Sequence, residues 1–200
     1  MSISTIIISV VTIVVLVASL KMYLQDSELV QVKSGIDGRT YLVRDLKDKY
    51  QAADQLAKIR ANLIKIVKYM DEKFPDDPRV KRMIKNFDPN VISEGIPDVR
   101  YTSYSVNKGS KIVFCVRQRD QNNSLVDMNT MSFVAIHELS HLATKSIGHT
   151  IEFWENMSFL LKSVLESPLN VYTYQPYHTK PQEYCGTQVS DTPFKINSKT

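Results

Sequence analysis

The sequence predicts an α+β fold in which one domain follows a single N-terminal transmembrane helix. Three features predict it: an uncharged apolar run at the N-terminus, a helical repeat followed by a hairpin pattern, and a His-Glu-x-x-His motif inside an apolar helix. Roughly 180 residues follow the apolar run, enough for one domain with a hydrophobic core. The expected organisation is an anchor over residues 1–24, a juxtamembrane segment over 25–43 and a domain over 44–200.

The apolar run covers residues 3–20 and is dominated by Ile, Val and Leu. At 1.5 Å per residue, such a helix of about 18 residues is ~27 Å long, close to the ~30 Å hydrocarbon core of a bilayer. A cleaved signal peptide is the alternative, with Val17-Ala18-Ser19 as its cleavage site. Signal peptides have a basic start and a shorter apolar part, whereas Met1-Ser2 carries no side-chain charge. An uncleaved membrane anchor is favoured.

The orientation of the anchor is predicted from the charges that flank it. Lys21, Lys33 and Arg39 follow the span and no basic side chain precedes it, so the positive-inside rule places the domain in the cytosol. Two glycosylation sequons begin at Asn122 and Asn156. Asn156 falls in a predicted helix of the domain, where a glycan is awkward, and this also favours the cytosolic side.

Turn signals at Gly35 and Asp37-Gly38 mark the juxtamembrane segment, and residues 39–43 are a candidate short strand. A long amphipathic helix is expected over residues 44–73, ending before Pro75 and Pro78. Its apolar positions recur at helical spacing: Leu46, Tyr50, Ala53, Leu56, Ile59, Leu63, Ile66, Val67 and Met70. A short helix over 79–86 and a loop over 90–97 follow.

Residues 101–106 and 111–117 alternate around Asn107-Lys108-Gly109, which predicts a β-hairpin. One of these two strands is expected at the edge of the sheet. An extended substrate binds such an edge through backbone hydrogen bonds, so cleavage needs little side-chain specificity.

The next helix carries the motif His137-Glu138-Leu139-Ser140-His141. An apolar run over residues 131–136 leads into it, so we expect a largely buried helix of about 15 residues, capped by Asp127 or Asn129 and ended by Gly148. Buried helices rarely carry His, Glu and His unless these side chains are paired or bind a metal.

Histidines four residues apart lie on one face of a helix, where both imidazoles can bind one zinc ion. His149 follows the Gly148 turn and is the expected third ligand; Glu152, Glu155 and Glu166 are the alternatives. Three protein ligands leave one zinc position for water, and Glu138 lies next to the first histidine, in reach of that water. Zn²⁺ is therefore the expected cofactor.

His-Glu-Leu-Ser-His followed by Gly-His-Thr-Ile-Glu-Phe-Trp resembles the WLM and SprT-like minimal zinc metalloproteases over roughly residues 100–165. The spacing from His149 to Phe153-Trp154 matches that family, whereas the spacer from His141 to His149 is longer than its commonest form. The resemblance implies a single zincin-like domain, with zinc at His137, His141 and His149 and Glu138 as general base. There is also a resemblance to anchored proteins of large DNA viruses.

Residues 150–165 are expected to form the following helix, with Trp154 packed in the core. The tail over 171–184 is rich in tyrosine and contains His178, and its prolines discourage regular structure; a Tyr hydroxyl or His178 could donate to an oxyanion, although packing is favoured. Cys115 is expected as a buried free thiol, with a disulfide to Cys185 left open for a luminal domain.

Together these features predict a membrane-anchored zinc metallopeptidase acting on a polypeptide substrate. One alternative is a catalytically inert anchored scaffold with a structural zinc, but a structural site needs no base such as Glu138. Another is a zinc amidase or deformylase acting on a small amide, but Cys115 lies outside the ligand motif. The net charge of +4 is dispersed, so charge does not indicate a nucleic-acid partner.

Overall fold

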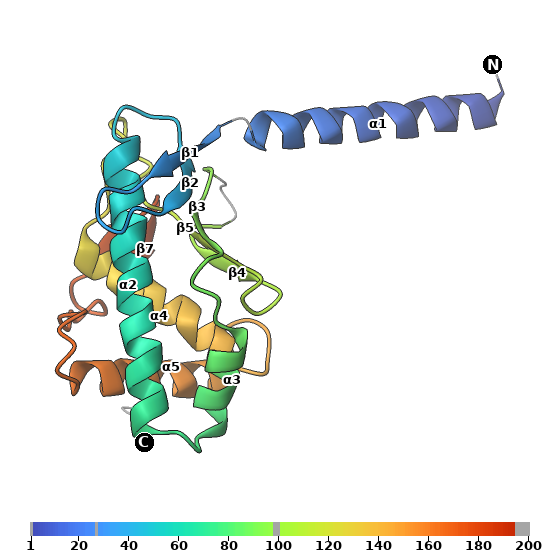
Figure 1. Ribbon diagram of the computed structural model, residues 1–200. Coiled ribbons are helices and arrows are strands. Elements are labelled where there is room, and N and C mark those ends of the chain that lie inside the picture. The colour runs from blue at the N-terminus through green and yellow to red at the C-terminus, as the bar shows by residue number, and fades with distance from the viewer. Residues whose placement is uncertain (1, 27, 98–100, 195–200) are drawn as a thin grey trace.

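The computed structural model describes residues 2–26, 28–97 and 101–194. It confirms the mixed α+β class (Figure 1). The helices are α1 (Ile3–Asp26), α2 (Lys49–Lys73), α3 (Pro78–Asn86), α4 (Met128–Ala143) and α5 (Ile151–Leu165). The strands are β1 (Leu29–Lys33), β2 (Thr40–Arg44), β3 (Ile92–Glu94), β4 (Tyr104–Val106), β5 (Lys111–Phe114), β6 (Gln182–Tyr184) and β7 (Thr187–Val189).

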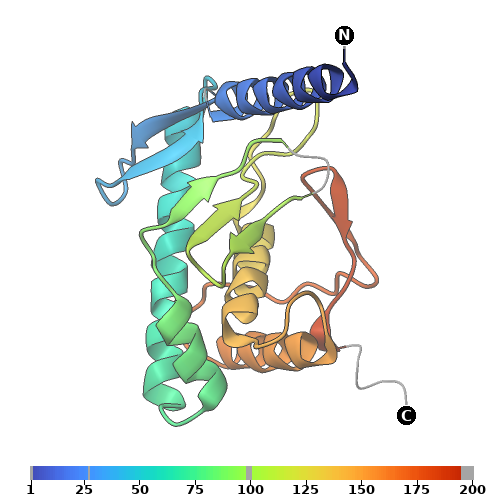
Figure 2. The same cartoon turned by 90° about the vertical axis from the view of Figure 1, so that its right-hand side faces the viewer.

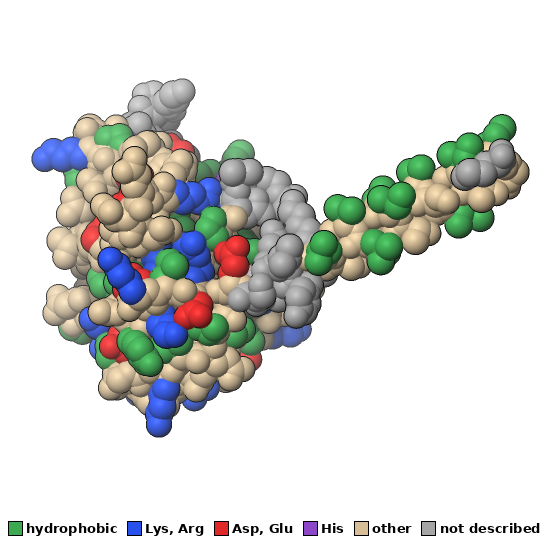
Figure 3. Space-filling model, turned by 90° about the horizontal axis from the view of Figure 1, so that it is seen from above, with side chains coloured by type: hydrophobic (Ala, Val, Ile, Leu, Met, Phe, Trp, Pro, Cys, Tyr) green, Lys and Arg blue, Asp and Glu red, His purple; other side chains and the backbone are tan. Residues whose placement is uncertain are grey.

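Helix α1 projects from the rest of the molecule (Figures 1 and 3). Its window Ile3–Leu20 has a mean hydropathy of 2.7 and is 0% buried, so the helix is long and apolar enough to cross a membrane. Apolar side chains are exposed along the length seen in Figure 3. Length and composition are also met by a signal sequence, so they identify a candidate span.

Strands β1 and β2 form an antiparallel hairpin directly after α1. The hairpin packs on α2 through Val32, Tyr41 and Val43, which alternate with exposed positions as expected for a half-buried ribbon. Helix α2 begins at Lys49, five residues later than the predicted start, because Arg44 belongs to β2 and its backbone N–H donates to Glu94. The predicted short helix is confirmed as α3, with Asp77 capping its first turn.

The predicted hairpin is confirmed as β4 and β5, which pair antiparallel. The loop expected over 90–97 is partly wrong, because Ile92–Glu94 forms β3 and pairs parallel with β5. The strand order β3-β5-β4 leaves β4 at the edge, and among the described residues it pairs with β5 alone. The sequence pattern did not predict β3, because this strand is only three residues long and is buried on both faces.

Helix α4 occupies the centre of the domain, in contact with α2, α3 and α5. Figure 2 shows α2 and α4 side by side, with α5 crossing beneath the lower end of α4. The core between these elements is continuous and includes Leu56, Ile66, Met131, Ile136 and Leu160, each at most 2% exposed. Burial of this kind explains the uninterrupted apolar run before the motif.

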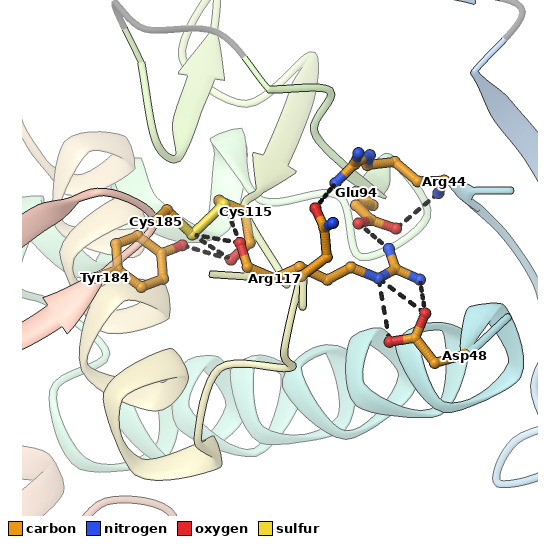
Figure 4. Close-up of polar contacts among 8 residues, drawn as sticks. Arg44, Asp48, Glu94, Cys115, Arg117, Tyr184 and Cys185 are labelled. Carbon is orange, nitrogen blue, oxygen red and sulfur yellow. Dashed lines mark hydrogen bonds and ion pairs between the residues drawn. A yellow bond between two sulfur atoms is a disulfide. The ribbon is translucent and has the colours of Figure 1, made fainter. Parts of the chain in front are cut away.

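The C-terminal tail is more regular than expected, because β6 and β7 form an antiparallel hairpin around Cys185 and Gly186. The expectation of a free thiol is also wrong, because Cys115 and Cys185 form a disulfide across a sequence separation of 70 residues (Figure 4). Gln118 adds two hydrogen bonds, accepting from the Cys185 N–H at 2.7 Å and donating to the Glu183 carbonyl at 2.9 Å. The hairpin is thereby fixed to the segment after β5.

The same segment carries a buried ion-pair cluster (Figure 4). The guanidinium of Arg117, 2% exposed, contacts the carboxylates of Glu94 and Asp48. These groups join the end of β3, the start of α2 and the disulfide-bonded segment. Because truncating one partner would leave a buried charge unpaired, the cluster fixes the mutual placement of these elements.

Candidate metal centre

Helix α4 presents the motif because its ends are fixed by specific contacts. Asp127 caps the N-terminus and accepts from the Thr130 N–H at 2.9 Å, which confirms one of the two predicted caps. The C-terminus lies at Ala143, so the prediction that Gly148 ends the helix is wrong. Side chains from other elements satisfy the last carbonyls instead: Asn86 donates to Leu142 at 3.0 Å, and Arg82 and Asn156 donate to Ala143.

The third histidine lies on the loop between α4 and α5. Glu152 anchors this loop, because its carboxylate accepts from the backbone N–H groups of Lys145 and Ser146 at 3.0 Å and from the Ser146 hydroxyl at 2.8 Å. These bonds lower the pKa of Glu152 to about 2. Glu152 is thus engaged in holding the loop, and it is absent from the ligand cluster, as are the other two carboxylates considered as alternatives, Glu155 and Glu166.

The structure brings the three predicted histidine ligands together. One ligand nitrogen from each of His137, His141 and His149 lies within 4.8 Å of the others. The Nε2 atoms of His137 and His149 are 3.0 Å apart. Three imidazole nitrogens that lie this close together could hold a metal ion.

One aromatic ring lies behind all three imidazoles. Phe153, fully buried on α5, stacks on His141 with ring centroids 4.2 Å apart and an interplanar angle of 27°. Its ring centroid is also 4.8 Å from those of His137 and His149, in tilted or edge-on contact. Phe153 thus forms the inner wall of the histidine cluster.

The imidazoles are held in the neutral form that binds metals. Burial, together with the neighbouring histidines, lowers the pKa of His137 to about 3. Burial is also the first cause that lowers the pKa of His141 to about 4, followed by His149 and Lys108. Burial lowers the pKa of His149 as well, although Asp191 opposes the shift. Near pH 7 none of the three needs to lose a proton before it binds a metal.

Glu138 points into the interior of the site. Its side chain is 4% exposed, and its Oε2 atom has no hydrogen-bond partner among the described residues. Burial without a partner raises the pKa of Glu138 to about 8. An unpartnered buried carboxyl is costly in a purely structural helix, so this atom is a feature that packing alone does not explain.

The histidines and Glu138 line a cavity of about 580 Å³. The lining includes residues of β4 and its turn, and Thr187–Asp191 from β7 and the residues that follow it. Lys108 connects the β4–β5 turn to the third-ligand loop, since its ammonium donates to the carbonyls of Thr144 at 2.9 Å and Ser146 at 2.6 Å. The strand edge and the loop that carries His149 are therefore directly linked.

The tyrosine-rich tail contributes Tyr184 to the site, in the packing role that the sequence favoured. Tyr184 lines the cavity, but its hydroxyl bonds to Ser103 and to the Cys115 carbonyl, which makes it a packing element rather than a free donor. His178 is exposed and outside the cavity lining. The prediction for Trp154 is partly correct: it packs against the core, and it also lines the cavity, with its ring centroid 5.9 Å from that of His149.

The fold and the site define a mixed α+β protein with a candidate metal centre behind an apolar N-terminal helix. The chain belongs to the same family as Uncharacterized protein R325 of Acanthamoeba polyphaga mimivirus, with which it is 32% identical over 195 residues, or 94% of this chain and 98% of that protein. Uncharacterized protein 042R of Invertebrate iridescent virus 3 is 31% identical over 83 residues, 42% of this chain and 48% of that protein. No family model and no solved structure matches the chain.

Proposed function

We propose that this chain is a membrane-anchored, zinc-dependent peptidase of the zincin type, similar to the WLM and SprT-like proteases. One observation carries the proposal: three convergent imidazole nitrogens and the unpartnered carboxyl of Glu138 line the same cavity. A structural zinc would need neither the cavity nor the buried acid. The charge distribution around the span favours a domain that faces the cytosol, whereas the disulfide between Cys115 and Cys185 favours an oxidising compartment.

The roles of the residues follow from their chemistry. His137, His141 and His149 would hold zinc, which supplies Lewis acidity by lowering the pKa of a water and polarising a carbonyl. A zinc ion beside Glu138 would oppose the effect of burial on its pKa and favour the carboxylate, which would accept the proton of the attacking water and donate it to the leaving amine. Because the Oε2 atom of Glu138 has no hydrogen-bond partner among the described residues, the carboxyl is available to accept a proton.

The cavity walls support a polypeptide as substrate. Within the described residues β4 pairs on one side only, so its other edge offers backbone N–H and C=O groups to an extended chain. Residues Thr102–Ser105 at this edge line the cavity beside the histidines. Recognition through backbone groups would let the enzyme accept many sequences, provided that the segment is unfolded.

The test is a comparison of the purified protein with a Glu138→Gln variant on unstructured protein substrates. The substitution keeps the shape and removes the base, so turnover should fall at least ~10²-fold while the zinc content stays near one equivalent. His149→Ala should weaken zinc binding much more than His178→Ala, its matched control. The proposal is wrong if the Glu138→Gln variant turns over substrate at the wild-type rate. It is also wrong if protein that has never been exposed to a chelator contains no metal.

A further inference from the structure

The connection between α1 and the domain is very short. Helix α1 ends at Asp26, and the carbonyl of Glu28 already accepts from the Asp45 N–H at 3.0 Å. A chain advances at most ~3.6 Å per residue, so the two steps from Asp26 to Glu28 span no more than about 7 Å. The connection between the end of α1 and the first hydrogen bond of the domain is therefore no longer than about 7 Å.

The β1–β2 hairpin does not serve as a flexible linker either. Ser34 and Gly35, in its turn, donate to the carboxylate of Asp54 on α2 at 2.7 and 2.8 Å. At its other end the Arg44 N–H donates to Glu94 at 2.7 Å. With the buried side chains described above, these bonds fix the hairpin to α2 and β3. The whole domain must then move with its first residues.

The reach of the site follows from helix lengths. Residues 21–26 continue α1 beyond the apolar window, which adds about 9 Å at 1.5 Å per residue. Helix α2, the longest helix of the domain, has 25 residues and is about 37 Å long, which sets the greatest further distance. Helix α4 packs beside α2, and its C-terminal end, near the histidines, contacts Asn86 at the end of α3. The candidate centre is therefore held within roughly 50 Å of the bilayer surface.

We infer that the substrates are polypeptides attached to the same membrane, cut in extended segments within about 50 Å of its surface. This inference rests on the proposed peptidase function and on α1 as a membrane span. Confinement of enzyme and substrate to one surface raises their effective concentration, and a tether that cannot span the distance reduces it almost to zero. The short junction thus restricts the substrates to polypeptides near the membrane, a restriction that the cavity itself does not impose.

The experiment uses the full chain in lipid vesicles and one unstructured reporter segment in three forms. The first form is coupled directly to a lipid on the face where the domain lies. The second is coupled through a semi-rigid helix of about 60 residues, roughly 90 Å long where helical. The third is soluble at the same total concentration. The direct form should be cut at least ~10-fold faster than the other two.

A matched variant tests whether the tether is the cause. Inserting the same helix between Ser27 and Glu28 should restore cleavage of the reporter on the 60-residue helix. Its rate should then be within a few-fold of the rate for the reporter coupled directly to lipid. If the protein with the native junction cleaves the reporter coupled directly to lipid and the reporter on the 60-residue helix at equal rates, the inference is overturned while the peptidase function stays intact. If no reporter is cut by zinc-loaded protein above the Glu138→Gln background, the peptidase function itself is wrong and the inference fails with it.

Discussion

At the scale of single residues, Phe153 acts as the support for the whole ligand set. Metal-binding histidines are usually oriented by carboxylates or carbonyls behind them, and changes to such partners cost 10–100-fold in metal affinity. Here the ring of Phe153 contacts all three imidazoles from behind. Phe159 lies on the same helix and instead contacts Phe74, with ring centroids 5.0 Å apart.

We expect Phe153→Leu to weaken zinc binding by about 10–100-fold, because the imidazoles lose their common wall. Phe159→Leu removes an aromatic ring from the same helix and should leave the affinity within about twofold. Competition with a chelator measures both, and the visible spectrum of the cobalt-substituted protein reports ligand geometry independently of stability. Equal affinities and identical cobalt spectra for the two variants would contradict this role.

The buried groups of the site also set the pH dependence of the metal-free protein. His137 and His141 have lowered pKa values, so the unfolded chain takes up more protons as the pH falls below about 6.5, and stability is lost. Glu138 has a raised pKa, so its contribution is present at low pH and is lost as the pH rises from about 4.5 to about 8. The free energy of unfolding should peak near pH 6.5.

Glu138→Gln should remove the alkaline decline, whose slope is at most about 1.4 kcal/mol per pH unit for one proton. Glu155→Gln, at an exposed position of α5, should retain it. Denaturant titrations of chelator-treated protein across pH 5–9 give the comparison. The explanation fails if both variants lose stability equally between pH 6.5 and 8.

At the scale of elements, the C-terminal hairpin depends on its disulfide. Strands of three residues are too short to hold a hairpin by themselves, and β6 and β7 pair only with each other within the described chain. The bond closes a loop of 70 residues, for which removal is expected to cost about 2–4 kcal/mol.

A double variant, Cys115→Ser with Cys185→Ser, should lower the free energy of unfolding by that amount and increase hydrogen exchange over residues 182–189. Exchange in the β1–β2 hairpin, which has its own bonds to Asp54, should stay at the native rate. Unchanged exchange in β6 and β7 would show that Tyr184 and Gln118 suffice to hold them.

The sequence predicted the helices and one hairpin because their signals are local. Helical spacing, a capping Asp127 and the Asn107-Lys108-Gly109 turn each lie within a few residues of the element they specify. The three histidines and Glu138 were predictable for the same reason. Strand β3 pairs with residues 20 positions further along the chain, and the tail hairpin is held by a disulfide between cysteines 70 residues apart, so no short pattern encodes them. The contact of Phe153 with the imidazoles could be predicted only from the packing of the residues behind them.

At the scale of the whole molecule, α1 is the candidate membrane span. Its 18-residue apolar window, which is 0% buried, is expected to stay in the bilayer after an alkaline carbonate wash. A chain lacking residues 1–26 should instead be soluble and keep its fold, because the domain makes its first hydrogen bond at Glu28. A mature N-terminus near residue 20, or release of the intact chain by the wash, would replace the anchor with a cleaved signal.

The buried side chain of Asn156 makes the domain incompatible with glycosylation at this position. It is 3% exposed, and its amide donates to the Thr144 hydroxyl at 2.9 Å, at the junction between α4 and the third-ligand loop. A sugar chain on this nitrogen would remove α5 from the core and take Phe153 away from the histidines. The disulfide, however, requires an oxidising environment. Recombinant production should therefore succeed in a bacterial host with an oxidising cytoplasm and fail along a glycosylating secretory route unless Ser158 is replaced.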